Sequence, residues 1–177
     1  MEKIEVDISA VIFAGFMATL GMTLLMSLTT IFGLPPSDIA VMLARLFGVE
    51  SLEGDRGIWW LGMATHFMIG ALIIPLAYAY FMAPGWDASP VRRGLVLGFG
   101  LWLFSQIIIA PLVGLGVFSL AGPSPYLRLA GDLLVHLVYG GVLGGLIGKN
   151  DSVLSVSEEE FEEVQDSDRE QPKVGNL

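Results

Sequence analysis

Four long apolar stretches, separated by short polar segments, dominate the hydrophobic pattern of the chain. They cover about residues 8–33, 57–82, 94–120 and 127–148. A helix needs roughly 20 apolar residues to cross the hydrocarbon core of a bilayer, and each stretch is long enough. The pattern therefore predicts an all-α, integral membrane four-helix bundle formed by residues 1–149.

The first connection contains the signals for a further short helix. Pro35 and Pro36 end the preceding span, because proline lacks an amide hydrogen and clashes with the helical turn before it. Ser37 is then a favourable N-cap with Asp38 in the first turn, and Gly48 is typical of the position after a helix. The apolar residues between them share one face: Ile39, Met42, Leu43, Leu46 and Phe47. We expect this helix in the membrane interface or against the bundle.

The composition supports a membrane protein and sets the C-terminal segment apart. Hydrophobic residues make up 54% of the chain and charged residues only 15%, compared with about 25% charged residues in soluble domains. Nine acidic and two basic residues lie in 151–177, so this segment carries −7 of the formal net charge of −9. We expect residues 150–177 to form an acidic, disordered cytoplasmic tail.

Several classes of function are excluded by what the sequence lacks. It has no basic patch that would neutralise phosphates, which argues against nucleic acid as a partner. It has no cysteine, which excludes disulfides and thiolate metal sites. It also has no Walker A loop, no Gly-x-Ser-x-Gly and no His-Glu-x-x-His sequence, so we predict that the protein is not an enzyme.

The basic residues beside the spans favour cytoplasmic termini. Four of them flank the spans on the side of the termini and three on the other side: Lys3, Arg92, Arg93 and Lys149 against Arg45, Arg56 and Arg128. Cytoplasmic loops are enriched in Lys and Arg. The excess therefore predicts a multi-pass protein of the cell membrane with both termini in the cytoplasm.

The sequence also suggests two helical hairpins in tandem. Spans one and three both contain glycine-rich segments, at residues 15–21 and 94–100. Spans two and four carry His-x-x-x-Gly sequences that begin at His66 and His136, the only two histidines in the chain. We therefore predict a tandem duplication in which both hairpins have the same orientation.

Both histidines are predicted to lie at the same depth in the membrane. Each is about nine residues into its span, which places it roughly 13 Å deep and close to the midplane. Residues four apart share a helix face. The residues that accompany the two rings in this way are Gly62 and Gly70 for His66, and Asp132, Gly140, Gly144 and Gly148 for His136. An ionisable residue at this depth faces the bundle interior and marks a candidate functional site.

Three interpretations of the histidine pair stay open. In the first, the glycines allow close helix packing and the histidines hydrogen-bond across the interface, with Asp132 orienting His136. Further partners in that case are Ser105, Gln106 or Thr65. In the second, His66 and His136 are axial ligands of a b-type haem, and Asp132 forms a hydrogen bond with His136. In the third, the same three side chains form a proton relay or bind a metal or a quinone.

Four short sequences give the chain a family resemblance. They are Gly-Phe-Met-Ala-Thr from Gly15, Pro-x-x-Asp-Ile-Ala-x-Met-Leu in the first connection, His-Phe-Met-Ile-Gly from His66, and His-Leu-Val-Tyr-Gly from His136. With these, the chain resembles a family of small four-helix membrane proteins of bacteria and archaea whose function is unknown. The resemblance covers about Phe13 to Gly148 and draws attention to His66, His136 and Asp38. It implies the same architecture, and Asp132 lies outside its pattern.

The sequence predicts a non-enzymatic membrane protein, a small accessory or structural subunit. It would pack through its glycine-rich faces with itself or with a larger complex in the lipid bilayer. The first alternative is a membrane electron carrier with a b-type haem held by His66 and His136. The second is a small channel or transporter for protons or solutes.

Overall fold

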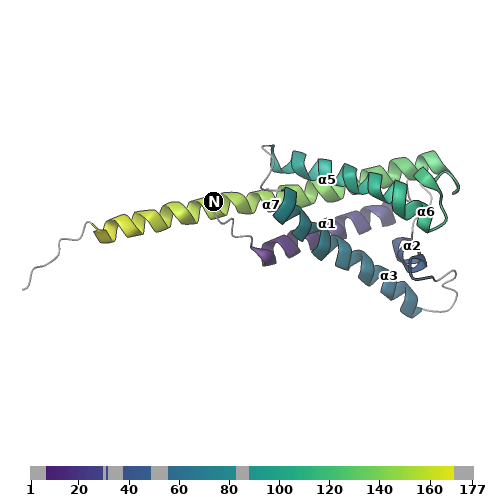
Figure 1. Ribbon diagram of the computed structural model, residues 1–177, viewed down its shortest axis with the longest axis horizontal. Helices are drawn as coiled ribbons and strands as arrows, with labels where there is room; N and C mark the ends of the chain where they lie inside the picture. Colours follow the sequence, from purple (N-terminus) through teal and green to yellow (C-terminus); the bar gives the residue numbers. More distant parts are fainter. Residues whose placement is uncertain (1–6, 30, 32–37, 49–55, 83–87, 170–177) are drawn as a thin grey trace, which may run out of the picture.

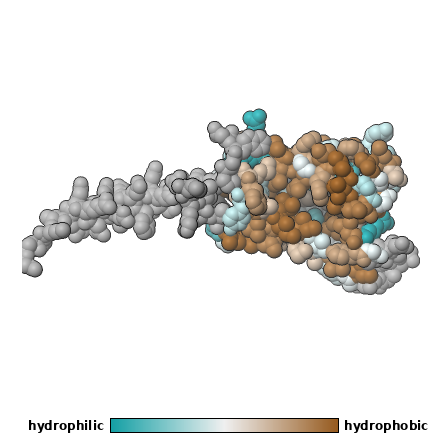
Figure 2. Space-filling model, viewed as in Figure 1, coloured by the Kyte–Doolittle hydropathy of each residue, from teal (hydrophilic) through white to brown (hydrophobic). Residues whose placement is uncertain are grey.

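The computed structural model describes residues 7–29, 31, 38–48, 56–82 and 88–169. Four of its helices are long and apolar enough to cross a membrane, which confirms the predicted four-helix membrane bundle. These spans are Ile8–Leu28, Gly57–Met82, Pro90–Leu112 and Pro125–Gly148. Figure 2 shows that apolar residues cover the middle of the face in view, while hydrophilic residues gather toward its ends. That surface suits a protein embedded in lipid.

The first and last spans are each one continuous helix, whereas the two middle spans change their helical pitch. The continuous helices are α1 (Ile8–Thr29) and α7 (Pro125–Arg169). Span two combines α3 (Arg56–Met68), the π-helical turn η2 (Ile69–Ile73), α4 (Ile74–Ala77) and the π-helical turn η3 (Tyr78–Met82). Span three combines α5 (Pro90–Phe104), the π-helical turn η4 (Ser105–Ile109) and α6 (Ala110–Leu112).

A proline explains one π-helical turn in each middle span. The turn η2 directly precedes the helix that contains Pro75, and η4 directly precedes the helix that contains Pro111. A proline inside a helix removes one amide hydrogen and pushes against the carbonyl four residues earlier. A wider turn at that point relieves the clash, so both spans cross the membrane without breaking.

The helix α7 lies at the centre of the packing. It contacts α5 along most of its membrane part and contacts α1 on another side, while α3 crosses the bundle at a steeper angle (Figure 1). The start of α1 and the point where α7 leaves the bundle lie at the same end (Figure 1). We call this the terminal end. The opposite end carries α2 (Ile39–Arg45) and the short 3₁₀ turn η5 (Val117–Ser119).

Glycines bring the helix backbones together on the terminal side of the histidines. A Cβ atom on Gly94 would overlap the carbonyl of Gly140, and one on Gly144 would overlap the carbonyl of Pro90. Close approach without side chains between the helices is a common way of packing spans in lipid. The predicted packing glycines 140, 144 and 148 therefore make their contacts with α5 of the same chain. The sequence suggested that these three glycines form a surface for a partner protein, but in the structure they are covered by α5.

Corresponding contacts recur in the two hairpins. Gly15 of α1 lies against Ala71 and Pro75, while Gly94 of α5 lies against Gly140 and Gly144. The first pair of partners comes from span two and the second from span four. The tandem duplication stays a prediction, and these paired contacts favour it.

The third span differs from its predicted range of 94–120. The helix begins earlier because Pro90 occupies its first turn, where proline is well tolerated, and Ser89 is the N-cap. It ends at Leu112 because Gly114 and Gly116 adopt positive φ angles of 84° and 73°, which reverse the chain. The first span also ends earlier than predicted, at Thr29, and residues 32–37 lie outside the described part.

The helix α2 lies against the bundle rather than alone in the interface. Its N-cap is Asp38, whose carboxylate accepts hydrogen bonds from the amides of Ala40 and Val41. The predicted N-cap, Ser37, lies outside the described residues. The other carboxylate oxygen of Asp38 accepts a hydrogen bond from Trp59 Nε1 at 3.1 Å. Gly62 has no side chain to separate α3 from the backbone of Ala40, so α2 packs closely on α3.

The segment after residue 149 differs from the expected disorder. The helix α7 continues without interruption from the membrane span to Arg169 (Figure 1). Between Gly148 and Pro172 the sequence has no glycine or proline and contains many good helix formers such as glutamate, leucine and glutamine. Net charge and polarity predict disorder only on average, and local helix propensity explains the helix here. Residues 170–177 lie outside the described residues.

The glycine contact between α5 and α7 can be tested with two alanine substitutions in one helix. Gly94→Ala places a methyl group on the backbone of Gly140, so we expect a loss of about 1–3 kcal/mol in stability. Gly100→Ala, with nothing near its Cβ position, should be neutral or stabilising by up to about 1 kcal/mol. Thermal unfolding in detergent measures both. Equal stability of the two variants would contradict the packing.

Candidate functional site

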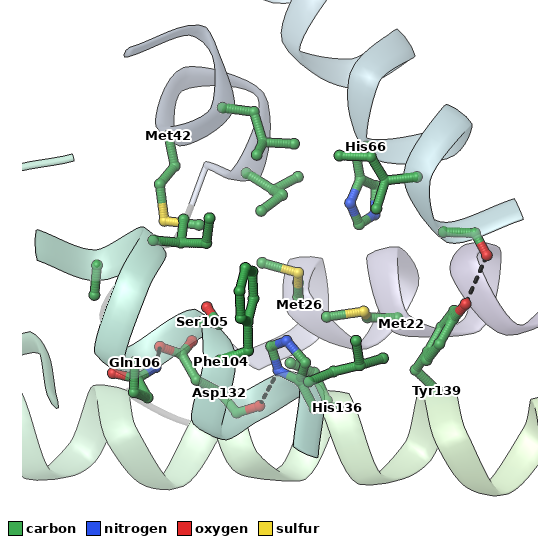
Figure 3. A pocket seen from close by; sticks show the side chains of 18 of the residues that line it. Met22, Met26, Met42, His66, Phe104, Ser105, Gln106, Asp132, His136 and Tyr139 are labelled. Atoms are coloured by element: carbon green, nitrogen blue, oxygen red, sulfur yellow. Dashed lines mark hydrogen bonds between the residues drawn. The ribbon is translucent and has the colours of Figure 1, made fainter. Parts of the chain in front are cut away.

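A cavity of about 210 Å³ lies among the four spans on the side of α2 and η5. Both predicted histidines and Asp132 line it (Figure 3). Most of its other lining residues are apolar, and α2 contributes Met42 and Leu43. The lining therefore combines a large apolar surface with a few polar groups, which is typical of small-molecule sites.

His66 hydrogen-bonds across a helix interface. Its Nε2 lies 3.0 Å from Oγ1 of Thr23 on α1. The Thr23 hydroxyl has one proton, which it donates to the carbonyl oxygen of Thr19 at 2.8 Å. With the proton in that bond, the hydroxyl oxygen accepts from His66, which corresponds to the tautomer with the imidazole proton on Nε2 and a free lone pair on Nδ1.

His136 forms its hydrogen bond within its own helix. Its Nδ1 lies 2.6 Å from the backbone carbonyl oxygen of Asp132, one turn earlier in α7. A carbonyl only accepts, so Nδ1 carries the proton and Nε2 has the lone pair. Figure 3 shows Nε2 pointing away from α7 into the cavity. Among the described residues, this nitrogen has no hydrogen-bond partner.

The two rings reach the cavity from different walls. His66 comes from span two and His136 from α7, and the side chains of Met22 and Met26 on α1 lie between them in Figure 3. No hydrogen bond joins the two imidazoles in the described part of the chain. The first interpretation, an interhelical hydrogen bond, therefore describes His66 with Thr23 and not the histidines with one another.

A second polar group sits on the wall near η5. The side chain of Gln106 donates a hydrogen bond from Nε2 to Asp132 Oδ2 at 3.1 Å. Its Oε1 accepts a hydrogen bond from the Ser119 hydroxyl at 2.9 Å. Gln106 and Ser119 are each only 1% exposed. This network joins three parts of the chain: span three, the turn that follows α6, and the helix α7. It does so at a depth where the bilayer supplies no water.

The polar groups stop where the glycine contacts begin. Tyr139, the next lining residue along α7, donates its hydroxyl proton to the carbonyl oxygen of Gly70 at 2.7 Å. A Cβ atom on Gly70 would overlap Thr19, so span two lies directly against α1 at this level. Beyond it, Leu143 and Ile147 of α7 and Ala14 and Val11 of α1 form a buried apolar core. The cavity therefore occupies one half of the bundle.

Several predicted roles need correction. Asp132 holds His136 through its backbone carbonyl, while its carboxylate binds Gln106. The Thr65 hydroxyl donates to the Leu61 carbonyl of its own helix, and no hydrogen bond joins it to a histidine side chain in the described part of the chain. Ser105 lines the cavity without a hydrogen bond among the described residues. All five glycines predicted to pack, including Gly62 and Gly70, lie where a Cβ atom would overlap a neighbour.

The sequence interpretation missed Thr23 and Ser119. Thr23 lies inside the first apolar span, where a hydroxyl commonly donates to a carbonyl of its own helix. It does so, and only the packing of α1 on span two places it beside His66 as well. Ser119 was predicted inside a transmembrane helix, but the glycine turn after α6 directs it back to Gln106.

The donor set does not suit the metal interpretation. Within the described residues, no group of three His, Asp or Glu side chains comes together to hold an ion. A haem fits the site poorly as well. The cavity of about 210 Å³ is smaller than the pockets of roughly 300–1,000 Å³ that enclose drug-sized ligands, and a haem is larger than most of these ligands.

The fold and the site define a multi-pass α-helical membrane protein with a cavity between its spans. Residues 5–153 match the family of unknown function DUF6789, and the chain belongs to this family. No curated protein and no solved structure matches the chain.

The hydrogen bond between His66 and Thr23 can be tested with two substitutions of the threonine. Thr23→Val keeps the side-chain shape and removes the acceptor of His66 Nε2. We expect a loss of about 1 kcal/mol in stability, because hydrogen bonds inside membranes contribute amounts of that order. Thr23→Ser keeps the hydroxyl and should retain most of the stability. The contact would be refuted if Thr23→Val unfolds in detergent at the same temperature as Thr23→Ser.

Proposed function

We propose that this protein is a non-enzymatic membrane protein that binds a small ligand inside the bilayer, in the cavity between its spans. One observation carries the proposal: the cavity collects both histidines and the network of Asp132 and Gln106 in a mostly apolar lining. Polar side chains inside a membrane are costly and are usually retained for function. Their convergence on one cavity supports binding at that place.

The position of the cavity supports binding over conduction. A channel or an open transport path needs polar or water-filled space through the whole bundle. Here the polar groups that line the cavity end at Tyr139, and the half near the terminal end is filled by glycine contacts, apolar side chains and Tyr78, whose hydroxyl donates to the Pro90 carbonyl. The channel and transporter alternative therefore has little support from the geometry, and the haem alternative has little support from the size of the cavity.

The proposal also limits how an accessory subunit could act. The packing glycines are occupied by contacts within the chain. A second copy or a larger membrane complex would therefore have to meet the lipid-facing side chains, such as Phe99 of α5. An accessory role in such a complex is compatible with ligand binding, and it would not use Gly140, Gly144 and Gly148.

Ligand binding can be tested with 4-fluorotoluene as a probe, observed by fluorine NMR on the protein in detergent. Binding to the cavity is saturable, whereas uptake by the micelle is not. We expect saturable binding to the wild type, and its loss in Ser105→Phe, because the added ring fills space within the lining. Ile108→Phe, on the lipid-facing side of η4, should bind like the wild type. The proposal would be refuted if the wild type showed no saturable binding, or if Ser105→Phe bound the probe as well as the wild type does.

We further propose that the protein lies in the cell membrane with its terminal end in the cytoplasm. The chain has no cysteine, so single cysteines can be introduced without removing others. Ser89 and Ala121 are exposed and lie at opposite ends of span three.

A membrane-impermeant maleimide added to intact cells measures this orientation. We expect Ala121→Cys to react before lysis and Ser89→Cys to react only after lysis. The opposite pattern would show that the terminal end faces outward.

A further inference from the structure

The polar groups of the cavity are mostly acceptors of hydrogen bonds. His136 presents the lone pair of Nε2, because its only ring proton is donated to the Asp132 carbonyl. The Asp132 carboxylate accepts one of the two amide protons of Gln106 on Oδ2, and its second oxygen can accept a further hydrogen bond. Neither of these acceptors can be satisfied by an apolar molecule.

The hydroxyl groups of the lining add few donors. Three of them already donate their protons to the protein: Thr19 to the carbonyl of Gly15, Ser119 to Gln106, and Tyr139 to the carbonyl of Gly70. Ser105 is the exception, and its hydroxyl can rotate to donate or to accept. An occupant that only accepts hydrogen bonds would therefore leave His136 Nε2 without a partner.

The size of the cavity limits the occupant to a small molecule. A dry apolar cavity of about 150 Å³ accommodates benzene, so about 210 Å³ accommodates one substituted ring or an aliphatic chain of similar volume. The apolar residues from α1, α2 and span three would surround the body of such a molecule. The polar part would lie next to His136.

We infer that the ligand is a small apolar molecule with a hydroxyl group, a phenol or an alcohol, which donates its proton to His136 Nε2. This inference rests on the proposed function and specifies the chemistry that the cavity selects. Leaving a buried acceptor unpaired costs more than a hydrogen bond gains. A ligand with a hydroxyl group should therefore bind more tightly than one of the same shape with a methyl group in its place.

Three probes of nearly the same shape separate these chemistries. 4-Fluorophenol carries a donor, 4-fluorotoluene carries a methyl group, and 4-fluorobenzonitrile carries only an acceptor. Each affinity is measured by fluorine NMR and referred to the concentration of the probe in the micelles. We expect the phenol to bind about tenfold more tightly than the toluene, as one hydrogen bond to a buried group allows. The nitrile should gain nothing over the toluene.

Substitutions then test His136 as the acceptor. His136→Phe replaces the imidazole by an apolar ring, and the advantage of the phenol over the toluene should disappear. Leu134→Phe, an exposed residue on the same helix, is the matched control and should keep the advantage. If His136→Phe does not fold, the comparison of the three probes on the wild type still decides the chemistry.

The outcomes separate the inference from the proposed function. Equal binding of phenol and toluene, or a nitrile that binds as well as the phenol, would overturn the inference and leave ligand binding intact. A phenol advantage that survives His136→Phe would also overturn it. Saturable binding of none of the three probes would refute both the inference and the proposed function.

Discussion

The close approach of helix backbones at glycine is the contact on which the rest of this structure depends. Lipid offers no hydrophobic driving force between spans, so they must be held by van der Waals packing and by hydrogen bonds. At Gly94, Gly140 and Gly144 the backbones of α5 and α7 touch with no side chain between them, and Gly15 does the same for α1 and span two. These contacts fix the terminal half of the bundle. The cavity lies in the other half, beside α2 and η5.

The polar side chains of the cavity lie in that other half, and they are joined by hydrogen bonds within the protein. Because no water is available in the bilayer core, each polar side chain there must find a partner in the protein. Thr23 hydrogen-bonds to His66, and a backbone carbonyl accepts a hydrogen bond from His136. Gln106 joins Asp132 to the turn after α6. On His136, the lone pair of Nε2 faces the cavity without a partner among the described residues. That lone pair gives an otherwise apolar cavity a preference for a hydrogen-bond donor.

The sequence was sufficient for the spans and for the faces that carry the histidines. Length and the absence of charge identify a membrane span, and a four-residue spacing aligns Gly62, His66 and Gly70 on one face. It was insufficient for contacts that depend on how helices cross. Thr23 meets His66 only through the packing of α1 on span two. Ser119 meets Gln106 only because the chain reverses at Gly114 and Gly116. The helix after residue 149 was missed because overall charge was weighed above local helix propensity.

The central claim is that the two histidines carry their protons on different ring nitrogens. In His136 the unprotonated nitrogen is Nε2, and it faces the cavity inside the membrane. Solid-state NMR of the protein in bilayers, with ¹⁵N-labelled histidine, tests this directly, because the chain has only two histidines. The structure predicts two neutral rings of opposite tautomers, with the proton on Nδ1 in His136 and on Nε2 in His66. Thr23→Val should move only the signals of His66, which assigns them. A protonated Nε2 in His136, or two rings with the same tautomer, would contradict the account.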